Sequence, residues 1–482
     1  MIHNSWWDST QKRPRGRARS TAESSAVDSG MAGLVQAQEL DASLKELWTL
    51  RETFFAAEPS QKRALVDKRA RAIVSAAEGL GGAGSSAEER ARASFVRGRA
   101  LDAGEDYSKE AEEFLSRAAK LAPDFVDAWN ALGHAFWKKR DLAGARDCFE
   151  AANERSANAT SLRSLSQLAR ATAAPSGGGE PFDRSVALAK EALRLDLGDG
   201  ESWYVLGNAH VARYFHRGPT GRKTSDLTSA AKAYAAAEAK YAVANATTTA
   251  VDVEGVRGSW GNPDLFLNRG NLRRYLEDYD GAIADLERAE AMDPTLTPAR
   301  EAVDDCSRWA RRVEDLVKRK GGFKPKKRYD LDAALQSNAG LKAPEGYEEA
   351  TLADLARSDV GATAATAAAH FLASPNARKC LVLVVALELR RDGAVPPDAL
   401  LALGRGKLET PCVALSVYDG DTAKLAPGSL VVVLDPVVIK VPSPDPGGPG
   451  YLAVHCTDAT KLLVDGTPLP KVLRATSSST TQ

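Results

Sequence analysis

A fixed spacing of large apolar and small residues recurs along the first two thirds of the chain. In its clearest copy the spaced residues stand at offsets 0, 3, 4, 7, 16, 20 and 23, namely Trp129, Leu132, Gly133, Phe136, Ala145, Phe149 and Ala152. A second copy runs from Phe266 to Pro294, and a third, interrupted by an insertion, runs from Trp203 to Ala237. Offsets of three and four residues place side chains on one face of an α-helix, so each copy predicts two packed helices.

This is the spacing of the tetratricopeptide repeat (TPR), a helical hairpin of about 34 residues that stacks on its neighbours. The large residues pack against the next repeat, the Gly and Ala positions let the two helices approach closely, and proline ends the second helix. Stacked hairpins form a superhelix whose concave groove binds extended peptides. We predict a TPR superhelix over residues 33–320, with about five repeats, N-terminal helices and a C-terminal capping helix.

The segments around the repeats carry weaker patterns. Residues 1–32 contain arginines among Ser, Thr and Gly without apolar periodicity, which predicts a disordered basic arm. A solvated tail, a nuclear signal and part of an organellar transit peptide are all compatible with this arm. Residues 34–77 show helical spacing that includes Phe54 and Phe55, and they are predicted to cap the superhelix. The mostly polar stretch 245–262 is predicted as a loop.

The pattern changes after Gly321. Residues 321–340 are predicted to be a basic linker, because seven positive residues and no acid stand between Lys318 and Arg328. Short apolar runs typical of β-strands then alternate with turn signals, and they cover residues 380–389, 413–418, 430–441, 451–455 and 462–464. Five short strands predict a small barrel of the OB type over residues 341–475, with a disordered tail over 476–482. The predicted fold class is therefore an all-α TPR solenoid followed by a small all-β OB-like barrel.

Composition and motifs argue against catalysis. The chain has 64 basic and 64 acidic residues, so attraction to nucleic acid requires a local cluster. Cysteines and histidines lack metal-ligand spacing, nucleotide-binding and hydrolase motifs are absent, and no apolar run reaches the roughly 20 residues of a membrane span. We predict no enzyme activity, no metal, no cofactor and no membrane segment. His210 stands at a helix-packing position and is predicted to be buried and hydrogen-bonded.

Polar residues occupy the positions of the first helices that face the groove. The members of this set are Asp127, Asn130 and His134, then Glu201, Tyr204 and Asn208, then Asp264, Asn271 and Arg274. Asparagine can donate to a peptide carbonyl and accept from a peptide amide, and charged side chains can pair with opposite charges on a ligand. The set predicts a peptide-binding groove, although each residue taken alone is also compatible with ordinary solvated helix surface.

Several segments go beyond the generic repeat. They are the run from Ala128 to Lys139, the run from Ser202 to Asn208, and the run from Asn262 to Arg269, which contains Asn268. With these segments the chain resembles the tetratricopeptide repeat protein 5 family from about Leu34 onward. The resemblance implies that Asn268 also belongs to the groove. Position by position, the groove Arg of the family falls on Arg170, its groove Asp on Asp264, and its lysines that meet ribosomal RNA on Lys324 and Lys326.

The resemblance also implies a function. Members of the family recognise the N-terminal tetrapeptide of nascent tubulin at the ribosome, and they recruit a downstream adaptor that leads to an mRNA deadenylase complex and to decay of tubulin mRNA. A further groove acid of the family aligns with Pro298, which carries no charge. Lys327 extends the basic cluster, which can grip ribosomal RNA through its phosphates. The implied location is the cytoplasm.

A second function uses the same groove. Vertebrate relatives are also described as cofactors of stress-responsive transcription, so a nuclear scaffold or co-chaperone that binds transcription coactivators is the alternative. The ligand of the groove separates the two functions.

Overall fold

The computed structural model describes most of the chain. The described residues are 38–80, 82, 85–174, 178–216, 223–244, 251–337, 343–356, 376–389, 398–404, 411–418, 422–445, 447–464 and 466–470. The predicted arm (residues 1–32) and tail (residues 476–482) lie outside them.

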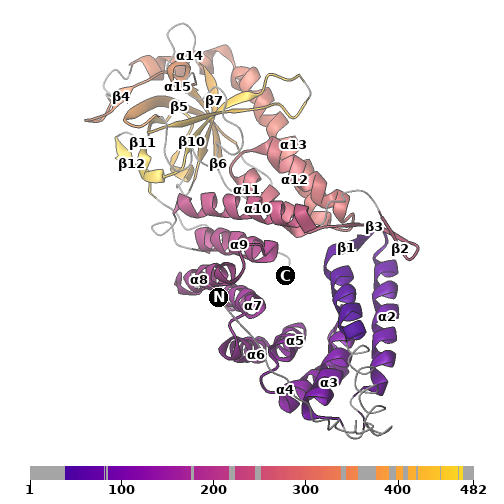
Figure 1. Ribbon diagram of the computed structural model, residues 1–482. Helices are drawn as coiled ribbons and strands as arrows, with labels where there is room; N and C mark the ends of the chain where they lie inside the picture. Colours follow the sequence, from indigo (N-terminus) through magenta and orange to yellow (C-terminus); the bar gives the residue numbers. More distant parts are fainter. Residues whose placement is uncertain are drawn as a thin grey trace, which may run out of the picture.

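Helical hairpins form the first two thirds of the molecule (Figure 1). After a helix over residues 38–53 and α2 (Pro59–Ala76), five hairpins follow within the described residues. They are α3 (Ala87–Leu101) with α4 (Lys109–Leu121), α5 (Val126–Lys138) with α6 (Leu142–Arg155), α7 (Ala159–Ala171) with α8 (Glu180–Leu195), α9 (Gly200–His216) with α10 (Thr224–Ala244), and α11 (Pro263–Tyr275) with α12 (Tyr279–Met292). Helix α13 (Thr297–Lys318) packs on α12. These hairpins confirm the predicted TPR solenoid.

Glycines in the first helices permit the close helix contacts. A Cβ atom at Gly207 would lie 2.5 Å from Cε1 of Tyr234, and one at Gly133 would lie 2.7 Å from Cε1 of Phe149. Such distances are sterically forbidden, because non-bonded carbon atoms repel one another well inside their optimal separation of about 3.5–4.0 Å. The small residues of the repeat spacing are therefore required by the packing of each hairpin.

Enlarging one of these glycines should destabilise the solenoid. We expect Gly207→Val to lower the stability of the chain by about 1–3 kcal/mol or more, because the buried Tyr234 ring must move. Thermal melting followed by circular dichroism would measure the loss. Gly79→Val is the matched control, since no atom lies within 4 Å of a Cβ built at Gly79. Equal melting of the two variants would contradict this account of the packing.

A small sheet joins two distant parts of the helical region. Strand β1 (Phe54–Ala56) pairs antiparallel with β3 (Val256–Trp260), which also pairs with β2 (Val251–Val253). Glu254 and Gly255, both with positive φ, form the turn between β2 and β3. The helical prediction for Phe54 and Phe55 was thus wrong, as was the loop prediction for residues 251–260. Each strand is too short to show a period of its own, and pairing with a distant segment decides its conformation.

The last part of the chain is a β-barrel domain. Its strands are β4 (Glu348–Glu349), β5 (Lys379–Leu389), β6 (Asp398–Gly404), β7 (Cys412–Val417), β8 (Leu430–Leu434), β9 (Val437–Val441), β10 (Tyr451–Cys456), β11 (Leu462–Val464) and β12 (Thr467–Pro468). Strands β5, β6 and β7 pair antiparallel in sequence order, and β10 pairs parallel with β7. Strand β8 pairs with β5 and the adjoining β9 with β10, so the segment from Leu430 to Val441 closes the sheet into a barrel.

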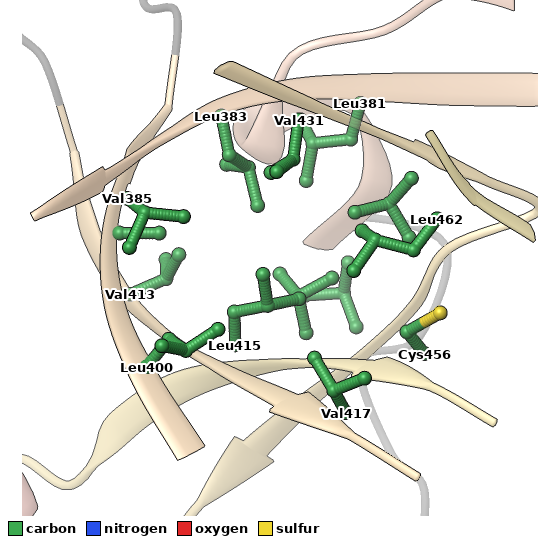
Figure 2. Close-up of a cluster of buried hydrophobic side chains, with 14 of the residues drawn as sticks. Leu381, Leu383, Val385, Leu400, Val413, Leu415, Val417, Val431, Cys456 and Leu462 are labelled. Carbon is green, nitrogen blue, oxygen red and sulfur yellow. The ribbon is translucent and has the colours of Figure 1, made fainter. Parts of the chain in front are cut away.

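Apolar side chains fill the barrel (Figure 2), which confirms the predicted all-β domain. Strand β6 was not predicted. Its sequence DALLALG is rich in Ala and Leu, which have little preference for strands, and it becomes a strand by pairing between β5 and β7.

The predicted basic linker contains a helix. Residues Pro325–Ser337 form α14, and its Leu331 and Leu335 are buried against Val384 and Leu403 of the barrel. A short helix, α15 (Leu352–Ala356), follows. The basic segment after Phe323 is therefore part of a packed element on the barrel, because the two leucines, four residues apart, share one face of the helix.

Polar groups buried between barrel and solenoid hold the two domains together. The Glu277 carboxylate accepts hydrogen bonds from Ser416 Oγ (2.5 Å) and His455 Nε2 (2.6 Å). Tyr418 Oη donates to the carbonyl oxygen of Tyr275 (3.0 Å), and their ring centroids lie 5.2 Å apart. The barrel thus covers the C-terminal end of the superhelix.

Removing the buried carboxylate should weaken this interface. We expect Glu277→Ala to destabilise the chain by about 1–3 kcal/mol, because Ser416 and His455 lose a buried hydrogen-bond acceptor. Limited proteolysis and thermal melting of the full chain would report the loosened barrel. Glu287→Ala, an exposed position on α12, is the control and should change neither measurement. An unchanged melting curve for Glu277→Ala would contradict the assigned role of this residue.

Candidate functional site

Arg170 lies on α7 as a cation without an acidic partner. Its Nη1 donates to Ser185 Oγ (2.8 Å) and approaches Ser166 Oγ (3.3 Å), and among the described residues no carboxylate pairs with it. Burial lowers the pKa of the guanidinium to about 10, so it is still charged at neutral pH. An enclosed arginine is ordinarily paired with an acid, whereas the described partners of this one are the hydroxyls of Ser166 and Ser185 and the Ser166 carbonyl oxygen (3.4 Å), all uncharged. It is therefore suited to receive an anionic group from a ligand.

A hydrogen-bond network on α9, α10 and α11 adjoins Arg170. Asn268 Nδ2 donates to Tyr204 Oη (2.8 Å) and to Asn208 Oδ1 (3.2 Å), and Tyr234 Oη donates to the same Asn208 oxygen (2.7 Å). Burial raises the pKa of Tyr204 and of Tyr234, so both phenols are neutral. The structure thus brings together three of the predicted groove residues, and it shows that they bond to one another.

Asp264 supplies negative charge beside the same network. It lies in the first turn of α11, and within the described part of the chain its carboxylate has no ion pair and no hydrogen bond. Burial by the surrounding protein raises the pKa of Asp264, and the charge of Asp293 adds to the rise, although solvent still reaches the side chain. The charge of Asp264 in turn contributes to the raised pKa of Tyr204, which also interacts with Arg170. Tyr204 thus interacts electrostatically with both Arg170 and Asp264, and neither of these charges has an ion-pair partner among the described residues.

The predicted groove residues of α5 have different surroundings. Asn130 is buried; it donates to Asn158 Oδ1 (3.1 Å) and accepts from Ser161 Oγ (2.7 Å), so its amide joins α5 to α7. Asp127 is exposed and, with His134, lines a pocket between α5 and the helix over residues 38–53. Burial, together with the charges of Arg99 and Arg51, lowers the pKa of His134 to about 3, so this imidazole is neutral. Asn130 joins the repeats and also lines this pocket beside Asp127 and His134.

Asn271 and the basic residues complete the predicted set. Asn271 is half-buried on α11 and makes no hydrogen bond to any described residue. Lys324, Lys326 and Lys327 are exposed at the start of α14, and Lys327 Nζ lies 4.7 Å from the ring centroid of Phe323. Helix α14 lies on the barrel, away from α5 and α7 (Figure 1). The basic cluster and the groove are separate surfaces.

The sequence did not predict that residues of the helix over residues 38–53 act on residues of the repeats. Arg51 and Glu52 belong to the helix over residues 38–53, yet Arg51 lowers the pKa of His134 and Glu52 contributes to the raised pKa of Glu201, whose main cause is burial. Tyr241 Oη donates to Glu201 Oε2 and accepts from Asn262 Nδ2 (3.3 Å). The repeat spacing contains no signal for the effects of Arg51 and Glu52, because these depend on how the N-terminal helix folds back.

Searches of the described residues add two findings. None of their helices is both long enough and apolar enough to cross a bilayer. No group of three or more His, Cys, Asp or Glu side chains in this part of the chain is arranged to hold a metal ion. His210 Nδ1 lies 2.8 Å from Asp226 Oδ1 and the side chain is buried, as predicted.

Comparison with known proteins identifies the repeats and gives named homologues. The tetratricopeptide repeat family model matches residues 126–158 and 263–296. A mouse protein named Tetratricopeptide repeat protein 5 is 38% identical over 253 residues (52% of this chain and 53% of the mouse protein), and the human protein of the same name is 33% identical over 305 residues (62% and 64%). The chain thus matches between about half and two thirds of the length of these relatives.

Solved structures with similar helices were also found. The Cut9–Hcn1 hetero-tetramer of APC/C has a TM-score of 0.39 and 14% identity, covering 56% of this chain and 43% of that chain. Yeast Tom70 has a TM-score of 0.33 and 14% identity, covering 62% and 55%.

Proposed function

Because this chain is a tetratricopeptide repeat protein with homologues among the mammalian proteins named Tetratricopeptide repeat protein 5, we propose that it is an adaptor that binds the N-terminus of nascent tubulin at the ribosome and promotes decay of tubulin mRNA. It acts without catalysing a reaction of its own. Its groove selects the nascent chain, and a downstream adaptor then leads to an mRNA deadenylase complex in the cytoplasm.

The observation that carries the proposal is the pair of opposite charges beside Tyr204. A tubulin N-terminus contains an arginine and a glutamate. The Arg170 guanidinium, whose partners among the described residues are uncharged serine oxygens, supplies the charge that the glutamate requires. The Asp264 carboxylate, which pairs with no described residue, supplies the charge that the arginine requires. Charge-assisted hydrogen bonds of this kind are stronger than those between neutral groups.

Replacement of the family's groove acid by Pro298 makes the remaining acid more important. Glu301 stands one helical turn beyond Pro298 near the start of α13 and is exposed. Both Asp264 and Glu201 act electrostatically on Tyr204, but Glu201 accepts a hydrogen bond from Tyr241 Oη, whereas Asp264 has no hydrogen-bond or ion-pair partner among the described residues. We assign the peptide arginine to Asp264 for this reason.

The basic cluster on α14 serves the second contact, with ribosomal RNA. Lys324, Lys326 and Lys327 are exposed and make no ion pair with any described acid, so their charges are available to phosphates. Contacts of this type provide affinity without reading sequence. The nascent peptide then supplies the specificity.

Sedimentation with stalled ribosomes tests the function as a whole. The full-length protein is mixed with ribosomes that display a tubulin N-terminus, with ribosomes that display the same chain in which the early arginine and glutamate are both glutamine, and with ribosomes that display an unrelated chain. We expect co-sedimentation above background with the first alone. Equal amounts in all three pellets would refute recognition of the nascent chain, and a groove that binds a transcription coactivator instead would support the nuclear alternative.

A further inference from the structure

A pocket beside the candidate groove takes no part in the contacts assigned to Arg170 and Asp264. It has a volume of about 380 Å³, and it lies between the helix over residues 38–53, α3, α5 and the start of α7. This volume is within the range of pockets that hold ligands. The apolar part of its lining consists of Leu44, Trp48, Phe95, Phe125 and Ala131. A wall of this composition can bury an apolar side chain of a ligand.

Contacts between the N-terminal helix, α3 and the start of α5 hold the aromatic wall in place. Trp48 Nε1 donates to the Arg99 carbonyl oxygen (3.1 Å), and the Arg99 guanidinium carbon lies 3.1 Å from the centroid of the Trp48 ring. The ring centroids of Phe95 and Phe125 lie 4.8 Å apart. The wall is therefore formed by contacts within the protein itself, which lowers the entropic cost of binding a ligand there.

The charges around the pocket disfavour a cationic side chain. Arg92 and Asp41, which both line the pocket, pair with each other. Burial and then four surrounding cations lower the pKa of His134, which also lines the pocket, and these cations are Arg99, Arg51, Lys138 and Arg163. Asp127 has the opposite charge but is exposed, so solvent and salt weaken its attraction for a cation. An uncharged apolar side chain suits both the wall and the charges.

The pocket lies on the side of Arg170 that is away from Asp264. Asp264 is on α11 and Arg170 on α7, whereas the pocket is formed by α5 and the elements before it, together with Thr160 in the first turn of α7. Thr160 and Arg170 are ten positions apart on one helix, so about 15 Å separates them along its axis. An extended chain covers this distance in about four or five residues.

We propose that this pocket is a second recognition site of the groove, which binds an apolar side chain of the nascent chain four or five residues beyond the glutamate that meets Arg170. The tetrapeptide by itself is too short to reach the pocket. The inference rests on the proposed function, and it adds that the ligand is longer than the tetrapeptide. Trp48, Phe95 and Phe125 are the residues that determine specificity at this second site, because they present the aromatic surface.

Extended peptides test the proposal. The full-length protein is titrated by calorimetry with the tubulin tetrapeptide extended at its C-terminus by serines, and with versions in which leucine or lysine replaces the serine at the fourth or the fifth position after the glutamate. We expect leucine at one of these positions to raise the affinity about tenfold or more over the serine peptide, because its side chain becomes buried in the pocket. Lysine should give no gain.

Two variants locate the gain in the pocket. Trp48→Ala removes the largest side chain of the wall, and Thr160→Phe fills the pocket from α7. We expect each variant to bind the leucine and serine peptides equally. Thr49→Phe, at an exposed position on the same helix as Trp48, is the control and should keep the gain. Melting curves show whether each variant is folded, and Thr160→Phe decides the result if Trp48→Ala does not fold.

The outcomes that overturn the inference differ from the one that overturns the proposed function. Equal affinities of the leucine and serine peptides, an equal gain with lysine, or a gain that persists in Thr160→Phe would each refute the second site and leave the proposed function standing. Failure of the serine peptide to bind the unmodified protein would refute the proposed function, and the inference with it.

Discussion

Arg170→Ala is expected to abolish recognition of the tubulin tetrapeptide. The substitution removes the guanidinium that, in our proposal, pairs with the glutamate of the peptide. Loss of one partner from a partly desolvated, hydrogen-bonded charge pair costs about 2–5 kcal/mol, which lowers affinity by more than about tenfold. Calorimetry with the tetrapeptide, and with a version in which glutamine replaces glutamate, would measure the loss. The unmodified protein should discriminate between the two peptides, and the variant should not.

The fold should survive this substitution. Ser166 and Ser185 keep their mutual hydrogen bond (2.9 Å between the Oγ atoms) when the guanidinium is removed. Arg194→Ala removes the same charge from an exposed position on α8, the partner helix of α7, and serves as the control. If Arg170→Ala binds both peptides as tightly as the control does, with unchanged melting, then Arg170 is not a ligand contact.

Reversing the charge of the basic cluster is expected to abolish ribosome association. We predict that replacing Lys324, Lys326 and Lys327 with glutamate prevents co-sedimentation with ribosomes and leaves binding of the free peptide intact. These side chains lie on the barrel, outside the groove. Association of the unmodified protein should also weaken with salt, with a log-log slope of about one unit for each phosphate contact.

The control for this variant reverses three other exposed lysines. Lys120, Lys190 and Lys232 lie on α4, α8 and α10, so their replacement changes the net charge equally. That control should still bind ribosomes. Loss of ribosome binding in both variants would mean that net charge alone governs association. If both variants still bind ribosomes, or if the association is insensitive to salt, the contact is with a ribosomal protein instead of ribosomal RNA.

The repeats and their packing could be predicted because the residues that pack each TPR hairpin are close together in the sequence. The spaced residues of each hairpin lie close together in the sequence, so helical periodicity and a few small residues specify the contact before any tertiary structure exists. Gly207 against Tyr234 follows directly from the repeat spacing. The burial of His210 follows from its packing position, and the barrel followed from a run of short apolar strands with turn signals between them.

Only part of the candidate site could be predicted from the sequence. Groove positions of the first helices were predicted from the repeat, and the resemblance pointed to Arg170 and Asp264. Which polar side chains are available to a ligand depends on their neighbours in other repeats. Asn130 is occupied by Asn158 and Ser161, whereas Arg170 has serine partners alone. No sequence pattern distinguishes these two cases.

By itself, the sequence determined that this protein is a stack of helical hairpins followed by a β domain, because both patterns repeat over short distances along the chain. Only the tertiary structure decided that β1 pairs with β3. The pairing of Phe54 with Trp260 joins the segment before α2 to the segment before α11, and strands this short have no stability of their own. Strand β6 and helix α14 were decided in the same way, since β6 forms by pairing with β5 and β7, and α14 by packing its two leucines on the barrel.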